Sequence, residues 1–428
     1  MSSTIPQAPA SLSSAPASSR LGRAQIMAFI AAFLGWMFDG MEMGIFPLVA
    51  RPALQEMQQG AVVQEGFVQY WMGVVTACFL LGAAGGGLVF GWLGDRIGRV
   101  RAMTLSILCY SIFTGLCYFA QEPWHLAVLR FISALGMGGE WSLGVALVME
   151  AWPAKFRPLM AGFIGAASNV GFLLVGVIGM LWHVTSTSWR CMFLIGAVPA
   201  VLTFFIRLFV PESERWKEAV SGKKVHPVRE IFAPGLFGKT ILATIFASIP
   251  LIVTWGIVQW IPLWTDQIAG PGNPGAKANS STWVALGAIF GCIFAALAGQ
   301  KIGRRPAYFA LCIAALASSA YLFGGLSEYG LLFISMVFVV GFFSASFYGW
   351  LPLYLPELFP TRVRATGQGL AFNFGRILAA VGVWNMGALM GIFDGSYAKA
   401  GLAISMVYVL GMIIIWTAPE TKGKPLPE

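Results

Sequence analysis

Two carboxylate residues lie within an apolar stretch near the start of the chain. Asp39 and Glu42 are three residues apart in residues 25–47, so a helix would place both on one face. Neighbouring carboxylates raise each other's affinity for protons, and burial raises it further. The pair therefore predicts a site that gains and loses a proton. The alternative for Glu42 is a solvated position at the rim of the apolar region.

A third carboxylate and an arginine share the apolar stretch 125–149. Arg130 stands near its start, and Glu140 would lie about 15 Å further along a helix, at about 1.5 Å per residue. Glu140 is a candidate proton carrier. Arg130 is a candidate partner of Asp39 or Glu42, or a substrate-binding residue. The alternatives are a snorkelling Arg130 at the membrane interface and a neutral, hydrogen-bonded structural carboxyl at Glu140.

A single cation lies near the middle of residues 366–392. No carboxylate in the last six predicted helices obviously balances Arg376, since Asp394 is well toward the outer end. A guanidinium binds a carboxylate through two parallel hydrogen bonds. Arg376 therefore predicts an anionic small-molecule substrate, and Asn373, one helical turn earlier, could add a hydrogen bond. The alternative is a structural ion pair between Arg376 and a carboxylate of the first half of the chain.

Motifs for other kinds of chemistry are missing from the sequence. It contains no G-x-x-x-x-G-K-[ST] nucleotide loop and no apparent Ser/His/Asp or Cys/His catalytic set. Its cysteines and histidines show no metal-binding spacing. We therefore expect no enzyme activity, no cofactor and no metal.

The elements that position these residues are suited to a lipid bilayer. The 428-residue chain is 57% hydrophobic and 11% charged, whereas soluble domains contain about 25% charged residues. An apolar helix of roughly 20 residues spans a bilayer. The sequence predicts an all-α membrane protein with twelve transmembrane helices, in two sets of six, at 25–47, 69–91, 102–120, 125–149, 159–181, 189–210, 240–264, 282–300, 306–326, 330–354, 366–392 and 400–418.

Lysine and arginine predict the orientation, because they concentrate in cytoplasmic loops. With both termini inside, the inner loops and tails hold 20 of the 27 Lys and Arg residues, and the outer loops hold four. This bias predicts cytoplasmic termini, explains the net charge of +9 without nucleic acid, and suits a bacterial inner membrane. The predicted parts are a disordered cytoplasmic tail at 1–22, six-helix bundles at 23–210 and 240–418, a cytoplasmic linker at 211–239 and a cytoplasmic tail at 419–428.

Loop sequences repeat between the two halves. Gly91–Arg101 follows the second predicted helix, and Gly299–Pro306 follows the eighth. Glu150–Arg157 follows the fourth, and Glu357–Arg364 follows the tenth. The halves are therefore predicted to be parallel repeats with a binding site at their interface, which is a known transporter design.

The chain resembles the major facilitator superfamily over essentially its whole length. Gly91–Arg101 matches the family pattern G-x-L-x-D-R-x-G-R-R-[RK] except at Val100, and the second copy has Gln300 where Asp would stand. The resemblance implies loop charges that form a latch, which breaks and re-forms between inward-open and outward-open states. The alternative is that these charges only hold the topology. The predicted latch residues are Gly91, Asp95, Arg96, Gly98, Arg99, Arg101, Glu150, Arg157, Arg304, Arg305, Glu357 and Arg362.

Further motifs resemble particular branches of the superfamily. Pro211–Trp216 and Pro419–Gly423 look like sugar-porter elements. Asp39–Glu42 resembles the D-G-x-D motif of aromatic-acid:proton and sialate:proton symporters, with Glu in place of the last Asp. Gly138–Trp141 looks like the sialate and monocarboxylate symporter branch. The sugar-porter Q-L-S element is absent, so an organic anion is favoured over a neutral sugar.

The same resemblance implies a cavity lined by the first, fourth, seventh and tenth helices. Trp255 and Gln259 in the seventh helix and Tyr348 in the tenth are therefore candidate substrate-binding residues. For a single tryptophan, the alternative is a place in the aromatic belt at the membrane interface.

Three functions remain open. The first is proton-coupled symport of a small organic anion such as sialate, a monocarboxylate or an aromatic acid. The second is proton-coupled transport of a sugar or polyol, and the third is a sensor without flux. The intact intramembrane charges favour transport. We expect a monomer in the bilayer that binds protons and a small-molecule substrate.

Overall fold

The computed structural model describes residues 22–58, 65–182, 184–221, 225–270, 272–273, 275–384 and 391–428. These described residues form helices and no strand. A bilayer offers the backbone no hydrogen-bond partners, so a helix, which satisfies its own N–H and C=O groups, is suited to crossing it. Ten helical segments are long and apolar enough to span a membrane. This indicates a multi-pass membrane protein.

The helices fall into two groups separated by a short charged stretch. The first group is α1 (Arg23–Met57), α2 (Glu65–Ile97), α3 (Arg99–Leu116), η1 (Cys117–Phe119), α4 (Pro123–Ala151), α5 (Arg157–Leu181), α6 (Trp189–Ala197) and α7 (Ala200–Phe209). The charged stretch holds α8 (Glu214–Val220) and α9 (Pro227–Ile231). The second group is α10 (Pro234–Gly256), η2 (Val258–Trp260), α11 (Ile261–Ala269), α12 (Ala276–Ile302), α13 (Arg304–Gly325), α14 (Leu331–Leu358), η3 (Thr361–Val363), α15 (Arg364–Trp384), α17 (Tyr397–Ser405), α18 (Val407–Ile414) and η4 (Ile415–Thr417).

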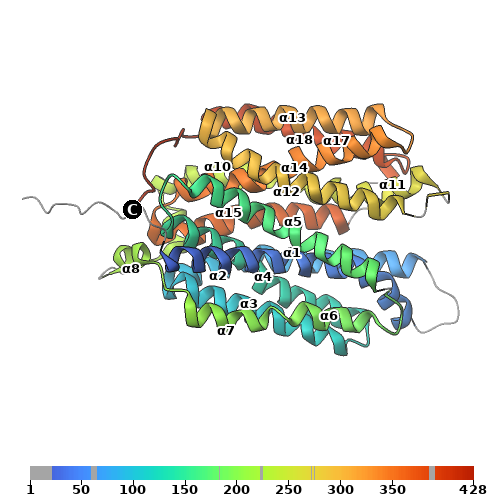
Figure 1. Cartoon of the computed structure of the whole chain (residues 1–428), viewed down its shortest axis with the longest axis horizontal. Coiled ribbons are helices and arrows are strands. Elements are labelled where there is room, and N and C mark those ends of the chain that lie inside the picture. The colour runs from blue at the N-terminus through green and yellow to red at the C-terminus, as the bar shows by residue number, and fades with distance from the viewer. Residues whose placement is uncertain are drawn as a thin grey trace, which may run out of the picture.

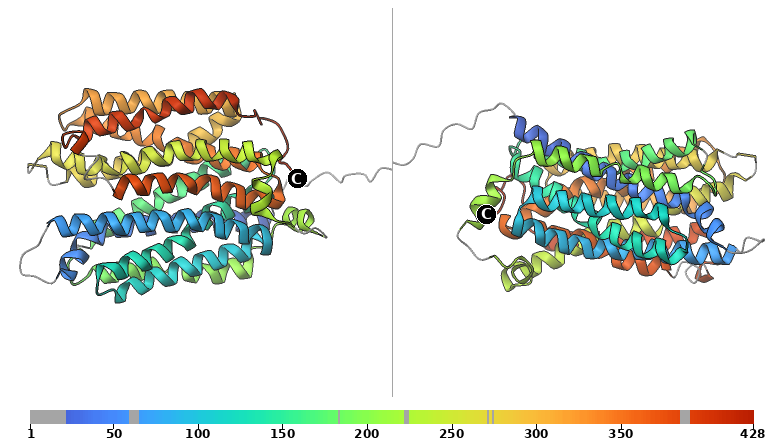
Figure 2. Two further views of the ribbon diagram at one scale, coloured as in Figure 1. Left: turned by 180° about the vertical axis from the view of Figure 1, so that it is seen from behind. Right: turned by 90° about the horizontal axis from the view of Figure 1, so that it is seen from below.

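The long helices lie side by side along one axis (Figure 1). In that view α13, α17 and α18 lie at the top, and α3, α6 and α7 lie at the bottom, with α5 and α15 between the two groups. α15 packs against α2 and α4, and α5 packs against α12 and α14, so these two helices carry much of the contact between the groups. α8 and the C-terminus lie at one end of the molecule, here named the α8 end (Figure 2).

Several predicted spans differ from single uninterrupted helices. Residues 189–210 form α6 and α7, which are separated at Val198 and Pro199; proline lacks the N–H that would continue the first helix. The span 240–264 begins earlier, at Pro234, and is divided where α10 ends at Gly256. The predicted span 366–392 runs past α15 into residues 385–390, which lie outside the described residues. The count of twelve therefore stays a prediction.

Glycines allow the closest helix contacts. A Cβ atom on Gly349 of α14 would lie 1.8 Å from the carbonyl oxygen of Cys292 on α12. A Cβ atom on Gly138 of α4 would lie 2.0 Å from the carbonyl oxygen of Ala83 on α2. Small residues at such crossings let two backbones approach, which is a main source of helix association in membranes.

We expect Gly349→Ala to destabilise the fold, because the obstructing atom is a backbone carbonyl that cannot rotate away. Overpacking of this kind costs about 1–3 kcal/mol. The measurement is the midpoint of thermal denaturation in detergent. Gly324→Ala is the matched control, because a Cβ atom there meets nothing within 4 Å, and alanine favours a helix. Equal midpoints for both variants would contradict the steric argument.

Candidate functional site

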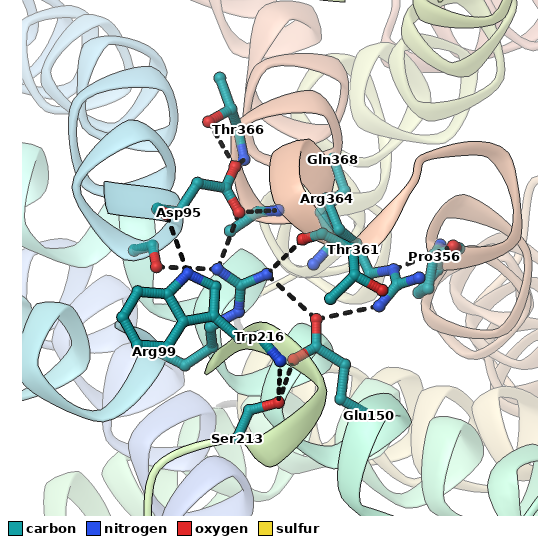
Figure 3. Close-up of polar contacts among 12 residues, drawn as sticks. Asp95, Arg99, Glu150, Ser213, Trp216, Pro356, Thr361, Arg364, Thr366 and Gln368 are labelled. Atoms are coloured by element: carbon teal, nitrogen blue, oxygen red, sulfur yellow. Dashed lines mark hydrogen bonds and ion pairs between the residues drawn. The ribbon is translucent and has the colours of Figure 1, made fainter. Parts of the chain in front are cut away.

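A buried polar network at the α8 end joins the two groups of helices (Figure 3). Asp95, near the end of α2, accepts hydrogen bonds from the backbone N–H groups of Ala365 (3.2 Å) and Thr366 (2.7 Å). It also accepts one from the Thr366 hydroxyl at 2.6 Å. The first N–H groups of a helix have no partner within it, and a negative charge there is favoured by the helix dipole. Asp95 therefore caps α15 from across the interface.

Arg99 lies at the centre of this network. Its guanidinium donates to Asp95 at 2.8 Å, to Glu150 at 3.1 Å and to the carbonyl oxygen of Thr361 at 2.7 Å. Arg364 donates to the same Glu150 oxygen at 2.9 Å. The side chains of these four charged residues are buried, and two carboxylates balance two guanidiniums. Such balance is needed, because an unpaired buried charge is strongly destabilising. We name Asp95, Arg99, Glu150, Arg364 and Thr366 the latch network.

Glu212 caps α3 beside the latch network. It accepts hydrogen bonds from the backbone N–H groups of Arg99 (2.8 Å) and Val100 (3.1 Å). The turn before α3 is made by Gly98, whose φ of 108° favours glycine. A Cβ atom on Gly98 would also lie 2.2 Å from a carboxylate oxygen of Glu212. Both the backbone conformation and the nearby Glu212 carboxylate therefore favour glycine at this predicted latch position.

The second copy of the loop forms a similar arrangement within the second group of helices. Arg304 donates to both oxygens of Glu357, at 3.0 and 2.6 Å. Glu420 accepts hydrogen bonds from the N–H groups of Arg304 and Arg305, both at 3.1 Å. Gln300 accepts a hydrogen bond from Arg304 at 3.1 Å. The carboxylate that caps a helix of the other group therefore has no counterpart here, and the repeat is asymmetric.

Glu420 lies outside the apolar helices, and its surroundings favour the charged form. Desolvation would raise the pKa of Glu420, but hydrogen bonds from the N–H groups of Arg304, Lys422, Arg305 and Thr421 hold that pKa below its usual value. The second cap is therefore expected to stay ionised at neutral pH.

Other predicted latch residues lie around the network. Arg96 and Arg101 are exposed, and Arg96 stacks over Trp92 at 5.2 Å. Arg157 donates to the carbonyl oxygen of Trp152 at 3.0 Å. In the second group, Arg305 contacts the carbonyl oxygen of Trp416, and Arg362 pairs with Glu230 at 2.7 Å. Gly91 has a packing role, since a Cβ atom there would lie 2.6 Å from the carbonyl oxygen of Ala365.

We expect Asp95→Asn to loosen the α8 end, because the amide removes the charge that caps α15 and pairs with Arg99. In a variant carrying Val363→Cys as its one reactive thiol, alkylation should be slow and should rise about 100-fold or more when Asp95→Asn is added, since breaking a buried pair costs about 3–5 kcal/mol and about 1.4 kcal/mol is a factor of ten. The control is Glu214→Gln, which removes an exposed ion pair with Lys217. An unchanged alkylation rate would contradict the latch and support the alternative that these charges only hold the topology.

Glu42 and Arg130 form a buried ion pair between α1 and α4. Arg130 donates to one carboxylate oxygen of Glu42, and the Ser133 hydroxyl donates to the same oxygen at 2.9 Å. The guanidinium also lies over the rings of Phe79 (4.4 Å) and Phe46 (5.4 Å). Glu42 and Arg130 are each 1% exposed. A solvated Glu42 and a snorkelling Arg130 are therefore wrong, and Arg130 is instead the partner of Glu42.

Asp39 and Glu140 are buried carboxyls whose oxygen atoms have no hydrogen-bond partner in the described part of the chain. Glu140 lies against α1, since a Cβ atom on Gly35 would be 2.0 Å from a Glu140 oxygen. Gly35 is one turn before Asp39 on the same helix, and Asp39 interacts electrostatically with Glu140, Arg376 and Glu42. The alternative of a hydrogen-bonded structural carboxyl at Glu140 requires a hydrogen bond, and the residues that the structure describes supply none.

Arg376 is buried on α15 and forms no ion pair within the described residues. Its guanidinium donates to the side-chain oxygen of Asn373 at 2.5 Å and interacts electrostatically with Tyr348 and Asp39. The Asn373 amide donates to the carbonyl oxygens of Gly138 on α4 and Gly369 on its own helix, both at 2.9 Å. A structural ion pair for Arg376 is therefore not found, whereas Asn373 is occupied by helix contacts.

Aromatic side chains from both groups of helices surround Phe372, one residue before Asn373. Trp141 of α4 stacks on it at 3.8 Å, and Trp36 of α1 meets it edge-on at 6.0 Å. Tyr348 of α14 meets it edge-on at 6.1 Å, and the Arg376 guanidinium lies 5.6 Å from its ring. The predicted Tyr348 thus belongs to the centre of the molecule.

Two other predicted substrate-binding residues are placed less centrally. Gln259 is exposed on η2. Trp255 is half-buried near the end of α10, and its carbonyl oxygen accepts a hydrogen bond from the indole N–H of Trp260 at 3.2 Å. The break between α10 and α11 moves this segment out of a straight helix, which the apolar pattern did not reveal.

Sequence reasoning missed several residues of the network. Ser213 donates to Glu150 at 2.5 Å, and the Trp216 indole donates to the Asp95 carbonyl oxygen at 2.8 Å. Both belong to Pro211–Trp216, whose resemblance to a family motif was the available signal. Arg364 ends the repeated segment Glu357–Arg364, so the repeat itself could have identified it.

Comparisons with known proteins agree on one family. The sequence profile of the Major Facilitator Superfamily matches residues 26–383. The sialic acid transporter NanX of Escherichia coli is 28% identical over 419 residues, which cover 94% of this chain and 95% of that protein. The cis,cis-muconate transport protein of Acinetobacter baylyi is 28% identical over 373 residues, which cover 85% and 87%.

A solved structure has the same fold. The proton:xylose symporter XylE bound to 6-bromo-6-deoxy-D-glucose superposes with a TM-score of 0.77, covering 94% of this chain and 98% of its own, at 18% identity. The predicted family is thereby confirmed, and with it the prediction of a transporter rather than an enzyme. The protein belongs to the Major Facilitator Superfamily and is a multi-pass membrane transporter of small molecules.

Proposed function

We propose that this protein is a proton-coupled symporter of a small organic anion. The observation that carries the proposal is Arg376, a buried cation between the two groups of helices with no carboxylate pair in the described part of the chain. A charge in a membrane protein normally faces a partner or a cavity. A substrate carboxylate would supply the missing partner, and the aromatic rings around Phe372 would supply apolar surface. The names of the two relatives, which refer to sialic acid and to muconate, support an acid.

The proton is proposed to bind at Asp39 and Glu140. Neither carboxyl receives a hydrogen bond from the residues that the structure describes, and burying an unpaired carboxylate is so costly that the neutral form is favoured. Glu42 differs, because the Arg130 guanidinium neutralises its charge and the Ser133 hydroxyl donates a hydrogen bond to it. We assign Glu42 and Arg130 a supporting role, in which their ion pair would open only if a proton reached Glu42.

The α8 end is proposed to face the cytoplasm. The start of α1 and the C-terminal segment both lie there, since the Trp152 indole donates to the Gln25 carbonyl oxygen, and Arg364 donates to that of Pro427, both at 2.8 Å. This supports cytoplasmic termini and an even number of spans, such as the twelve that we propose. The latch network then holds the cytoplasmic side closed in this state. A monomer in a bacterial inner membrane is the proposed context.

Proton-coupled sugar transport is the second candidate. The superposition with XylE shows a shared fold at 18% identity and no more than that. A neutral sugar would leave Arg376 without a counter-charge. The charge at the centre therefore favours the acid.

The test is uptake into proteoliposomes with an imposed inward proton gradient. The labelled probes are N-acetylneuraminate, cis,cis-muconate, lactate, benzoate, glucose and xylose, each with and without a protonophore. Protonophore-sensitive accumulation of one acid would support the proposal. Accumulation of a sugar alone would replace the proposal with the second candidate. Acid uptake that the protonophore leaves unchanged would show that transport is not coupled to protons.

A further inference from the structure

One face of α15 is closely applied to α2 and α4. A Cβ atom on Gly87 of α2 would lie 2.2 Å from the Asn373 amide nitrogen and 2.5 Å from the Gly369 carbonyl oxygen. A Cβ atom on Gly369 would in turn lie 2.2 Å from the Gly87 carbonyl oxygen. Thr366, Gly369, Asn373 and Arg376 are three or four residues apart, so they share this face of the helix.

Two amide side chains of α15 are hydrogen-bonded to the backbone of α4. Asn373 donates to the Gly138 carbonyl oxygen at 2.9 Å, and Gln368 donates to the Ser142 carbonyl oxygen at 2.5 Å. Gly138 and Ser142 are one turn apart, and both amides are fully buried. A carbonyl oxygen in a helix has a spare lone pair, so these bonds add to the helix and connect the two groups of helices. They lie between the latch network and Arg376.

Only one of these two amides is also connected to the central cation. The Asn373 oxygen accepts a hydrogen bond from Arg376 at 2.5 Å, whereas the Gln368 side-chain oxygen has no hydrogen-bond partner among the described residues. The bond from Arg376 fixes which way the Asn373 amide points, and therefore aims its nitrogen at Gly138. Without that bond only two carbonyl oxygens hold the amide nitrogen, that of Gly138 on α4 and that of Gly369 on its own helix.

We propose that Asn373 is a positioning residue that couples the occupancy of Arg376 to the closure of α15 on α4. A carboxylate held side-on by the two terminal nitrogens of Arg376 competes with the Asn373 oxygen for Nη1, the nitrogen that donates to it, and a charged acceptor is the stronger one. Asn373 is then released, its bond to Gly138 weakens, and the α8 end opens. Arg376 empty favours closure, and Arg376 occupied favours opening. That the ligand at Arg376 is an anion rests on the proposed function.

A double-mutant cycle without any ligand tests this coupling. Spin labels are placed at Arg101→Cys and Ile302→Cys, two exposed positions at the α8 end on different groups of helices, after replacement of the six native cysteines. Distance distributions by pulsed electron paramagnetic resonance give the ratio of open to closed molecules. Asn373→Leu and Arg376→Gln are each expected to raise this ratio about five- to tenfold, the range for one hydrogen bond. The double variant should show the same ratio as each single variant, because the effects of substituting two contacting residues do not add.

Gln368→Leu is the matched control within the same helix. It removes a hydrogen bond to α4, and Gln368 does not contact Arg376. When Gln368→Leu and Arg376→Gln are combined, the increase in the ratio should therefore be the product of the two separate increases. Multiplying effects of Asn373→Leu and Arg376→Gln, or no effect of Arg376→Gln, would overturn the coupling. If Asn373→Leu does not fold, Asn373→Ser takes its place in the cycle. Because no substrate is added, failure here leaves anion symport standing, and failure of anion uptake leaves the cycle interpretable.

Discussion

Arg376→Lys is expected to raise the KM for the transported anion about 100-fold while the protein remains folded. A lysine keeps the charge but presents one ammonium point in place of a planar fork. It therefore loses one charge-assisted hydrogen bond to the carboxylate, about 1.5–3 kcal/mol, and the orientation of the second. A loss of about 2.8 kcal/mol corresponds to a factor of about 100. The measurement is the initial rate of uptake over a range of anion concentrations.

Arg215→Lys is the control for this effect, because it makes the same exchange at an exposed position on α8, outside the latch residues. Its KM should match that of the parent protein. Arg376→Gln should bind still more weakly than Arg376→Lys, since it removes the charge as well. A KM that stays the same in Arg376→Lys would remove this residue from the binding site, and with it the main argument for an anionic substrate.

Asp39→Asn is expected to abolish accumulation against a gradient and to keep exchange of labelled for unlabelled anion. An amide resembles the protonated carboxyl in shape and charge, so the conformational cycle with bound substrate can proceed. It cannot release a proton, so the imposed gradient no longer drives net uptake. Both quantities are measured in the same proteoliposomes, as protonophore-sensitive accumulation and as counterflow.

Glu140→Gln decides which of the two neighbouring carboxyls carries the proton, because both lack hydrogen-bond partners. Asp266→Asn is the control, since Asp266 is exposed on α11, and its accumulation should be that of the parent protein. If Asp39→Asn still accumulates anion uphill and Glu140→Gln does not, the proton belongs to Glu140. Uphill accumulation in both single variants would leave neither residue with this role.

The helices were predictable because apolar content is a local property of the sequence. Of the predicted spans, ten correspond to long apolar helices of the structure. The breaks within the spans were not predictable from apolar content. Pro199 divides the span 189–210, whereas Pro250 lies inside α10 without ending it. Both are prolines in apolar surroundings, and only the neighbouring helices distinguish them.

The charged residues were predictable as a group but not as pairs. An ionisable side chain in an apolar stretch stands out by composition, so Asp39, Glu42, Glu140 and Arg376 could be named in advance. Which of them pair depends on contacts between residues far apart in the chain, such as Glu42 and Arg130, which are separated by 88 positions. From the sequence alone, Arg130 could equally have paired with Asp39 or reached the membrane interface.

The sequence by itself determined the solvent, the helical class and the family, because each rests on short patterns and on their sum along the chain. Only the tertiary structure decided that Asp95 caps α15, that Asn373 binds α4 while holding Arg376, and that Asp39 and Glu140 lack donors. Hydrogen bonds need their atoms within about 3 Å, and separation along the chain does not say which atoms come that close. The crossing of α15 with α2 and α4 sets those distances, and glycines on both sides allow it.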